Sequence, residues 1–111
     1  RPSKRRYIDV PLPTTGEMVR LQSLTELERT TYENSRFSKE GTLLPGRLQD
    51  SKARLICLCV VDEEGKPILK PGDERWIMDN MDSADSAFLY DHCWDHVGFR
   101  VKVNVEADAK N

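Results

Sequence analysis

The sequence predicts a mainly α-helical domain of the α+β class: about four helices, an N-terminal β-hairpin and a candidate C-terminal strand. Three observations support this prediction. Two short, partly alternating segments near the N-terminus flank a connection that contains glycine. Patterns that begin helices recur further along the chain. The residues after Gly98 alternate strictly between apolar and polar side chains.

The length of 111 residues supports one domain with a modest core. We divide the chain into a basic lead at residues 1–6, which we expect to be disordered, a single domain at residues 7–98, and a tail at residues 99–111. In the tail we expect a strand, if an edge is available to receive it, followed by disordered residues.

Composition and charge exclude several classes of partner. Charged residues make up 32% of the chain and the net charge is −2, which predicts a soluble globular protein without a nucleic-acid partner. No apolar run approaches the roughly 20 residues of a membrane span, so we expect no membrane partner. Three cysteines and no secretory leader indicate reduced thiols in a cytosol-like compartment.

The first predicted element is a β-hairpin with strands at residues 7–12 and 18–21. The connection contains Gly16, which suits a hairpin turn. Pro11 and Pro13 confine the first strand to an edge of the sheet, because proline cannot donate a ladder hydrogen bond.

A helix is predicted to follow, with Thr25 as its N-cap. Glu28 stands three residues later, and the two side chains form the pattern of a capping box. We expect the helix to end near residues 36–38 and a loop to follow at residues 39–42. The inward face is predicted from helical spacing to comprise Leu24, Leu27 and Thr31, extended by Tyr32 and Phe37.

The apolar run from Leu55 to Val61, followed by the acidic turn Asp62–Lys66, has two interpretations. It is the buried end of a helix that opens near Pro45, or it is a core strand. Good helix formers at residues 47–54 favour one helix of about 14–16 residues, ended at Gly65. Residues 60–61 and 67–69 would then pair briefly across the turn. The predicted buried stripe comprises Leu48, Leu55, Ile56 and Cys59.

Two more helices complete the predicted pattern. Residues 71–74 open the first, which carries Trp76, Ile77 and Met81. Asp82 or Ser83 caps the second, and Gly98 ends it. Its apolar residues are Ala84, Ala87, Phe88, Leu89, Cys93, Trp94 and Val97.

Three segments in this order resemble the tail assembly chaperones of long-tailed bacteriophages and prophages. They are Val10-Pro11 with Val19-Arg20-Leu21, then Leu24-Thr25-x-x-Glu28-Arg29, and above all residues 53–66, Ala-Arg-Leu-Ile-Cys-Leu-Cys-Val-Val-Asp-Glu-Glu-Gly-Lys. The resemblance covers residues 7–97. The chain departs from the family in its alternating tail, where members often carry an acidic helix, and in its density of Asp and His at residues 91–96.

The resemblance implies a protein that binds other proteins, without catalysis and without a cofactor. The implied partners are the tape-measure protein and the tail-tube protein during tail assembly. The implied location is the bacterial or host-cell cytoplasm, and the protein would leave before the virion matures. A structural tail or head–tail connector subunit is an alternative function.

A different alternative is a small metal-binding domain or metalloenzyme. His92 and His96 are four residues apart, a spacing at which two imidazoles on one helix face can bind zinc. With Asp95 they form a shortened relative of the inverted zincin pattern. A catalytic site would also need a third ligand and a general base, so ordinary polar surface beside a buried Cys93–Trp94 pair is the favoured interpretation.

Other candidate chemistry is weaker. Cys57 and Cys59 are expected to be small core residues, since two residues two apart on a helix point in different directions. Residues 62–64 lack the alternating ligands of a calcium loop and are expected to form a solvated turn.

The hairpin and the tail are the segments that a small helical core covers least well. We expect Val101, Val103 and Val105 to add to the hairpin edge of the same chain or to pair with a neighbouring copy, which would make the protein a homo-oligomer. Both arrangements place the tail beside the apolar hairpin residues. The predicted partner-binding residues are therefore Ile8, Val10, Val19 and Leu21 with Val101 and Val103.

Overall fold

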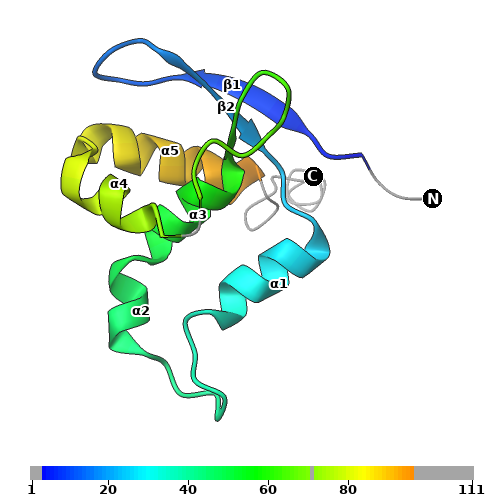
Figure 1. Ribbon diagram of the computed structural model, residues 1–111, viewed down its shortest axis with the longest axis vertical. Helices are drawn as coiled ribbons and strands as arrows, with labels where there is room; N and C mark the ends of the chain where they lie inside the picture. The colour runs from blue at the N-terminus through cyan, green and yellow to red at the C-terminus, as the bar shows by residue number, and fades with distance from the viewer. Residues whose placement is uncertain (1–3, 71, 97–111) are drawn as a thin grey trace, which may run out of the picture.

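The computed structural model describes residues 4–70 and 72–96, and its fold is α+β, as predicted (Figure 1). The elements are β1 (Tyr7–Pro11), β2 (Met18–Gln22), α1 (Glu26–Asn34), α2 (Pro45–Gln49), α3 (Ser51–Cys59), β3 (Val60–Val61), α4 (Glu74–Asn80) and α5 (Ser83–His96). The described residues contain five helices where about four were expected, because the second predicted helix is divided.

The hairpin is confirmed, and it is part of a three-stranded antiparallel sheet in the order β1-β2-β3. Ile8 pairs with Leu21 and Val10 with Val19. The third strand is the end of the apolar run: Val60 pairs with Leu21 and Val61 with Arg20. The pairing expected across the acidic turn is present as a single bridge between Val61 and Pro67.

One face of the sheet packs on the core, whereas the other is exposed along β1 and buried at Gln22 and Val61. Val10 and Leu21 are buried, and Ile8, Leu12 and Val19 are partly buried against the same cluster. On the opposite face, Asp9 accepts a hydrogen bond of 2.8 Å from Arg20. Along β1 this alternation is what an antiparallel strand with one covered face requires.

The centre of the core is α3. The predicted burial of Leu55, Ile56 and Cys59 is confirmed, since all three side chains are fully buried. The apolar run is helical up to Cys59 and extended at Val60–Val61, so each interpretation of it holds for one part. The single helix of 14–16 residues is wrong. The backbone leaves helical geometry at Asp50, where φ is −107° and ψ is 11°, and the side chain of Asp50 pairs with Arg54 instead of capping α3.

Helix α1 begins where it was predicted to begin, but most of the side chains predicted to face the core do not. The Thr25–Glu28 capping box is complete: the amide of each residue donates to the side chain of the other, at 2.9 and 3.2 Å. The predicted inward face is wrong at Leu27, Thr31 and Phe37, which are exposed. It is right at Tyr32, which is buried, and at Leu24, which is partly buried against the core. Only Tyr32 of α1 is buried, and the helix ends at Asn34, slightly before the predicted end.

Helices α4 and α5 complete the layer beneath the sheet. Ile77, Leu89 and Cys93 are buried as expected, whereas Trp76 is 54% exposed. Ala84 and Ala87 are also exposed, because the face of α5 toward the core is set by Asp85, Leu89, Cys93 and His96. In Figure 1 the hairpin crosses above α5 and α3, while α1 stands to one side.

Several sequence-based predictions concern parts of the chain outside the described residues. They are the state of residues 1–3, the roles of Val97 and Gly98, the strand in the tail, and the position of the Leu48 side chain. Within the described residues, no helix has both the length and the apolar character needed to cross a bilayer.

Candidate functional site

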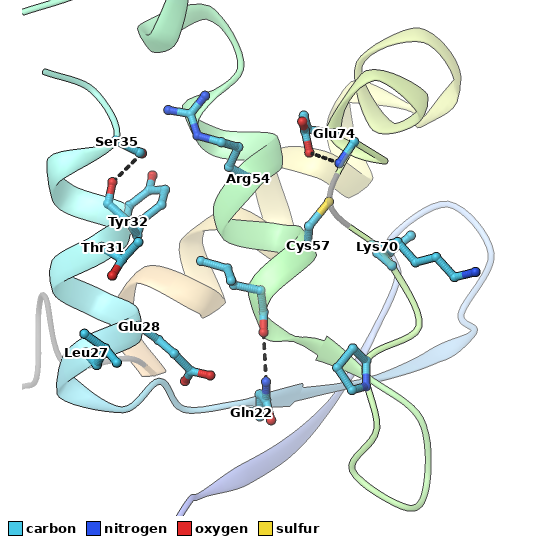
Figure 2. A pocket seen from close by; sticks show the side chains of 14 residues that line it. Gln22, Leu27, Glu28, Thr31, Tyr32, Ser35, Arg54, Cys57, Lys70 and Glu74 are labelled. Atoms are coloured by element: carbon cyan, nitrogen blue, oxygen red, sulfur yellow. Dashed lines mark hydrogen bonds between the residues drawn. The ribbon is translucent and has the colours of Figure 1, made fainter. Parts of the chain in front are cut away.

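An open apolar groove lies between α1 and α3, and we call it the α1–α3 groove. Its volume is about 540 Å³. Figure 2 shows α1 along one side, α3 through the middle, and the segment that carries Lys70 along the other side. The lining residues are Gln22, Leu27, Glu28, Thr31, Tyr32, Ser35, Arg54, Cys57, Leu58, Pro67, Leu69, Lys70, Gly72 and Glu74.

The floor of the groove is the outward face of α3. Leu55, Ile56 and Cys59 point into the core, which leaves Cys57 and Leu58 half-buried on the other side of the helix. The side chain of Gln22 reaches from the end of β2 and donates a 2.9 Å hydrogen bond to the carbonyl oxygen of Leu58 (Figure 2). That carbonyl lies near the end of α3, where no further helical turn supplies a donor.

The α1 side of the groove combines one anchored residue with two exposed ones. The hydroxyl of Tyr32 donates a 2.9 Å hydrogen bond to the carbonyl oxygen of Ser51, which ties α1 to the start of α3. Burial raises the pKa of Tyr32 to about 12. Leu27 and Thr31 lie on the open part of the same side, where they are available to a partner.

Three charged side chains of the groove, those of Glu28, Arg54 and Glu74, are engaged with groups of this chain. Arg5 donates a 2.9 Å hydrogen bond to Glu28. Arg54 pairs with Asp50, and Glu74 accepts a 3.1 Å bond from the amide of Gly72. Burial by itself would raise the pKa of Glu28, but the hydrogen bonds from Thr25 and Arg5 lower it below the ordinary value. The carboxylate is therefore ionised at neutral pH.

The described lining of the groove contains no activated thiol. Its one thiol, Cys57, is half-buried, and burial raises its pKa to about 12, with the charges of Glu74 and Asp73 acting in the same direction. A thiol with so high a pKa is protonated at pH 7, and the protonated form is a poor nucleophile and a poor metal ligand. The exposed surface of the groove is mainly apolar.

The structure does not bring the histidine candidates together as a site. His96 is buried, and its Nε2 lies 3.1 Å from the carbonyl oxygen of Arg6, to which it donates. Burial lowers the pKa of His96. His92 is half-buried with its ring against that of Phe88, at 4.5 Å between centroids, and Asp95 is exposed. Among the described residues, no group of three His, Cys, Asp or Glu side chains could hold a metal ion.

The predicted partner-binding residues of the hairpin lie on its packed face. Val10 and Leu21 are buried, and Ile8 and Val19 are partly buried. A partner strand beside these residues would therefore join the sheet through its edge. Val101, Val103 and Val105, which were expected to lie beside them, are outside the described residues.

The sequence analysis missed the groove and two buried polar residues. The sequence did contain one indication of the groove, because residues 55–61 are all apolar. A helix that is apolar on every side is normally buried on every side, so apolar side chains that this chain leaves uncovered form a surface for something else. Asp85 and His96 were not identified as buried. Asp85 accepts hydrogen bonds from both the amide and the hydroxyl of Thr14, and no short motif announces such a contact across the chain.

Fold and groove together describe a small α+β protein with an open, mainly apolar groove between two helices. This chain is similar to the solved structure of the bacteriophage HK97 tail assembly chaperone, with a TM-score of 0.62 and 16% sequence identity. The match covers 85% of this chain and 87% of that chain. The chain therefore has a phage tail assembly chaperone-like fold, and the resemblance seen in the sequence is confirmed at this level. No protein-family model and no curated protein matches the sequence.

Proposed function

We propose that this protein is a tail assembly chaperone that binds the tape-measure protein and the tail-tube protein in the cytoplasm, without catalysis, and leaves before the virion matures. The observation that carries this proposal is a fold shared with the HK97 chaperone over most of both chains. The α1–α3 groove adds a physical means, because a protein that holds another needs exposed apolar surface on a polar, soluble exterior.

The groove fits a few side chains from the apolar stripe of an amphipathic helix. Helices of this kind place residues i, i+3, i+4 and i+7 into a groove of the partner. Leu27 and Leu58 supply apolar contact from the two helices of the groove, while Lys70 and Glu74 supply charges at its other side. We propose that this amphipathic helix belongs to the tape-measure protein, the helical and apolar partner of the tail assembly chaperones that this chain resembles.

A pair of matched substitutions tests the groove. Leu27→Asp introduces a carboxylate into the groove without removing buried surface, since Leu27 is 77% exposed. It also places an acid in the first turn of α1, where the helix dipole favours it. Met18→Asp is the control, because Met18 is 59% exposed on β2 and does not line the groove.

The measurement is co-purification of each variant with the tape-measure protein from the same genome. We expect Leu27→Asp to weaken retention of the tape-measure protein at least tenfold and Met18→Asp to leave it unchanged. Equal retention by both variants would refute the groove as the binding site. No retention by the unmodified chain would refute the proposed partner.

Finished particles provide a second test of the function. A chaperone is expected in assembly intermediates and not in purified virions, whereas a structural tail or connector subunit stays in the particle. Mass spectrometry of purified virions distinguishes these outcomes. A constant number of copies per virion would overturn the chaperone proposal in favour of the structural one.

A further inference from the structure

The outer edge of β1 is open in the described part of the sheet. β2 lies between β1 and β3, so among residues 4–70 and 72–96 β1 has a neighbouring strand on one side only. The amide of Ser23 donates to the carbonyl of Arg6, and the amide of Leu12 to the carbonyl of Glu17. Because pairing alternates along an antiparallel strand, the even-numbered residues of β1 bond to β2, and the amides of Tyr7 and Asp9 point outward.

Helix α5 lies along the hairpin and ends beside the start of β1. At the hairpin turn, the hydroxyl of Thr14 donates a 2.6 Å hydrogen bond to Asp85, near the beginning of α5. At the other end, the ring of His96 donates to the carbonyl of Arg6, and Arg6 donates back to the carbonyl of His96. α5 therefore runs antiparallel to β1, and the chain leaves α5 next to the residue that precedes β1.

The same side of the molecule carries incompletely covered apolar residues. Ile8 and Leu12 of the β1 region are only partly buried against the core, and so is Phe88 of α5. At 100° per residue, Phe88 and His92 share one flank of α5, and Tyr90 lies on the other flank. Lys52 of α3 sits over the ring of Tyr90, so the flank with Phe88 faces away from α3. An additional strand beside β1 would extend the packed face of the sheet at this place.

We propose that the edge of β1 is a strand-docking site occupied by residues 99–105 of the same chain. The chain continues from His96, which lies beside the start of β1. Because α5 runs antiparallel to β1, a strand that turns back after α5 would run parallel to β1. Residues 99–105 alternate strictly between apolar and polar side chains. At about 3.3 Å per residue, these seven residues form a strand long enough to pair along the whole of the five-residue β1. Val101, Val103 and Val105 then lie on the packed face beside Ile8 and Leu12.

Closing this edge has a physical advantage. An open edge strand presents unpaired amides and carbonyls to any other chain, including further copies of this protein. Pro11 protects only the far end of β1, because it lacks an amide hydrogen. A docked tail would provide hydrogen-bond acceptors for the amides of Tyr7 and Asp9, and it would also cover the apolar side chains of Ile8 and Leu12. This inference does not rest on the proposed chaperone function.

Hydrogen exchange in the full-length protein tests the proposal, with one matched pair of variants. Val103→Asp and Asn104→Asp introduce the same side chain and the same change of charge at adjacent positions. On an alternating strand, position 103 faces the core and position 104 faces solvent. The readout is the exchange rate of the Tyr7 and Asp9 amides, measured by NMR.

We expect both amides to be protected in the unmodified chain and in Asn104→Asp, and to exchange at least tenfold faster in Val103→Asp. Unprotected Tyr7 and Asp9 amides in the unmodified chain would overturn the proposal. Protection that disappears on dilution, together with a dimer or larger species by light scattering, would show that a second copy occupies the edge. That outcome would overturn the assignment to the same chain.

Discussion

Helices α1 and α3 have the same length of nine residues and opposite relations to the core. α3 buries four side chains and lies at the centre of the molecule, whereas α1 buries Tyr32 alone. α1 carries a complete capping box, whereas α3 has no side-chain cap at Asp50. One helix is held by tertiary packing, and the other by its cap together with the hydrogen bonds from Tyr32 to Ser51 and from Arg5 to Glu28.

This difference explains where the groove is. A helix that packed closely on α3 would cover Cys57 and Leu58, but α1, which is joined to the start of α3 by the Tyr32 hydrogen bond, leaves apolar residues open on both helices. Binding surfaces are commonly drawn from the less tightly packed parts of a fold. The predictions below test how unequal the two helices are, from the largest expected effect to the smallest.

The strongest test of the contrast is Leu55→Ala in α3. The side chain is fully buried, so its truncation removes apolar contacts and leaves a cavity in the core. We expect the free energy of unfolding, measured by urea titration, to fall by about 2–5 kcal/mol. A loss below about 1 kcal/mol would mean that α3 is not the centre of the core.

Tyr32→Phe tests the anchor between the two helices. Removing the hydroxyl eliminates the hydrogen bond to Ser51, and we expect a loss of about 0.5–1.5 kcal/mol at neutral pH. Burial raises the pKa of Tyr32 to about 12, above the value near 10 in the unfolded chain. The stability due to the buried neutral phenol is complete below about pH 10 and is lost as the pH rises through 12. Urea titrations should therefore show that the difference in free energy of unfolding between the unmodified chain and Tyr32→Phe is smaller at about pH 11 than at neutral pH. A constant difference would contradict the assigned pKa of Tyr32.

Thr25→Ala tests how far α1 depends on its cap. The substitution removes the acceptor of the Glu28 amide at an exposed helix end, and we expect a loss of about 0.5–1 kcal/mol. Glu28 has a lowered pKa, so its contribution is present above the ordinary value of 4.5 and is lost as the pH falls below it. Thermal unfolding at neutral pH, with Thr30→Ala on the exposed surface of α1 as control, measures the effect. Equal effects of the two substitutions would show that the cap adds nothing specific.

The smallest effect is expected for Leu27→Ala. Because Leu27 is 77% exposed, we expect the free energy of unfolding to change by less than about 0.5 kcal/mol. Binding of the tape-measure protein should nevertheless weaken, which would separate the role of this residue from the stability of α1. A loss near that of Leu55→Ala would show that α1 packs on α3 in solution and closes the groove.

The sequence by itself determined the features that depend on neighbours along the chain. Alternation and Gly16 specify the hairpin, and Thr25 with Glu28 specifies the start of α1, because each of these interactions spans only a few residues. The helical part of the apolar run and the burial of Leu55, Ile56 and Cys59 also follow from local composition and spacing.

Only the tertiary structure decided the features that join distant segments. Val60 and Val61 are extended because β2 offers an edge where α3 ends, and pairing with that edge outweighs the tendency to continue the helix. Leu27 lines a groove and not the core because the side of α1 that reaches the core carries Tyr32. Asp85 and His96 are buried because Thr14 and Arg6, far away along the chain, supply their hydrogen-bond partners. A periodic pattern shows that a face will be covered, but which segment covers it depends on contacts that the pattern does not contain.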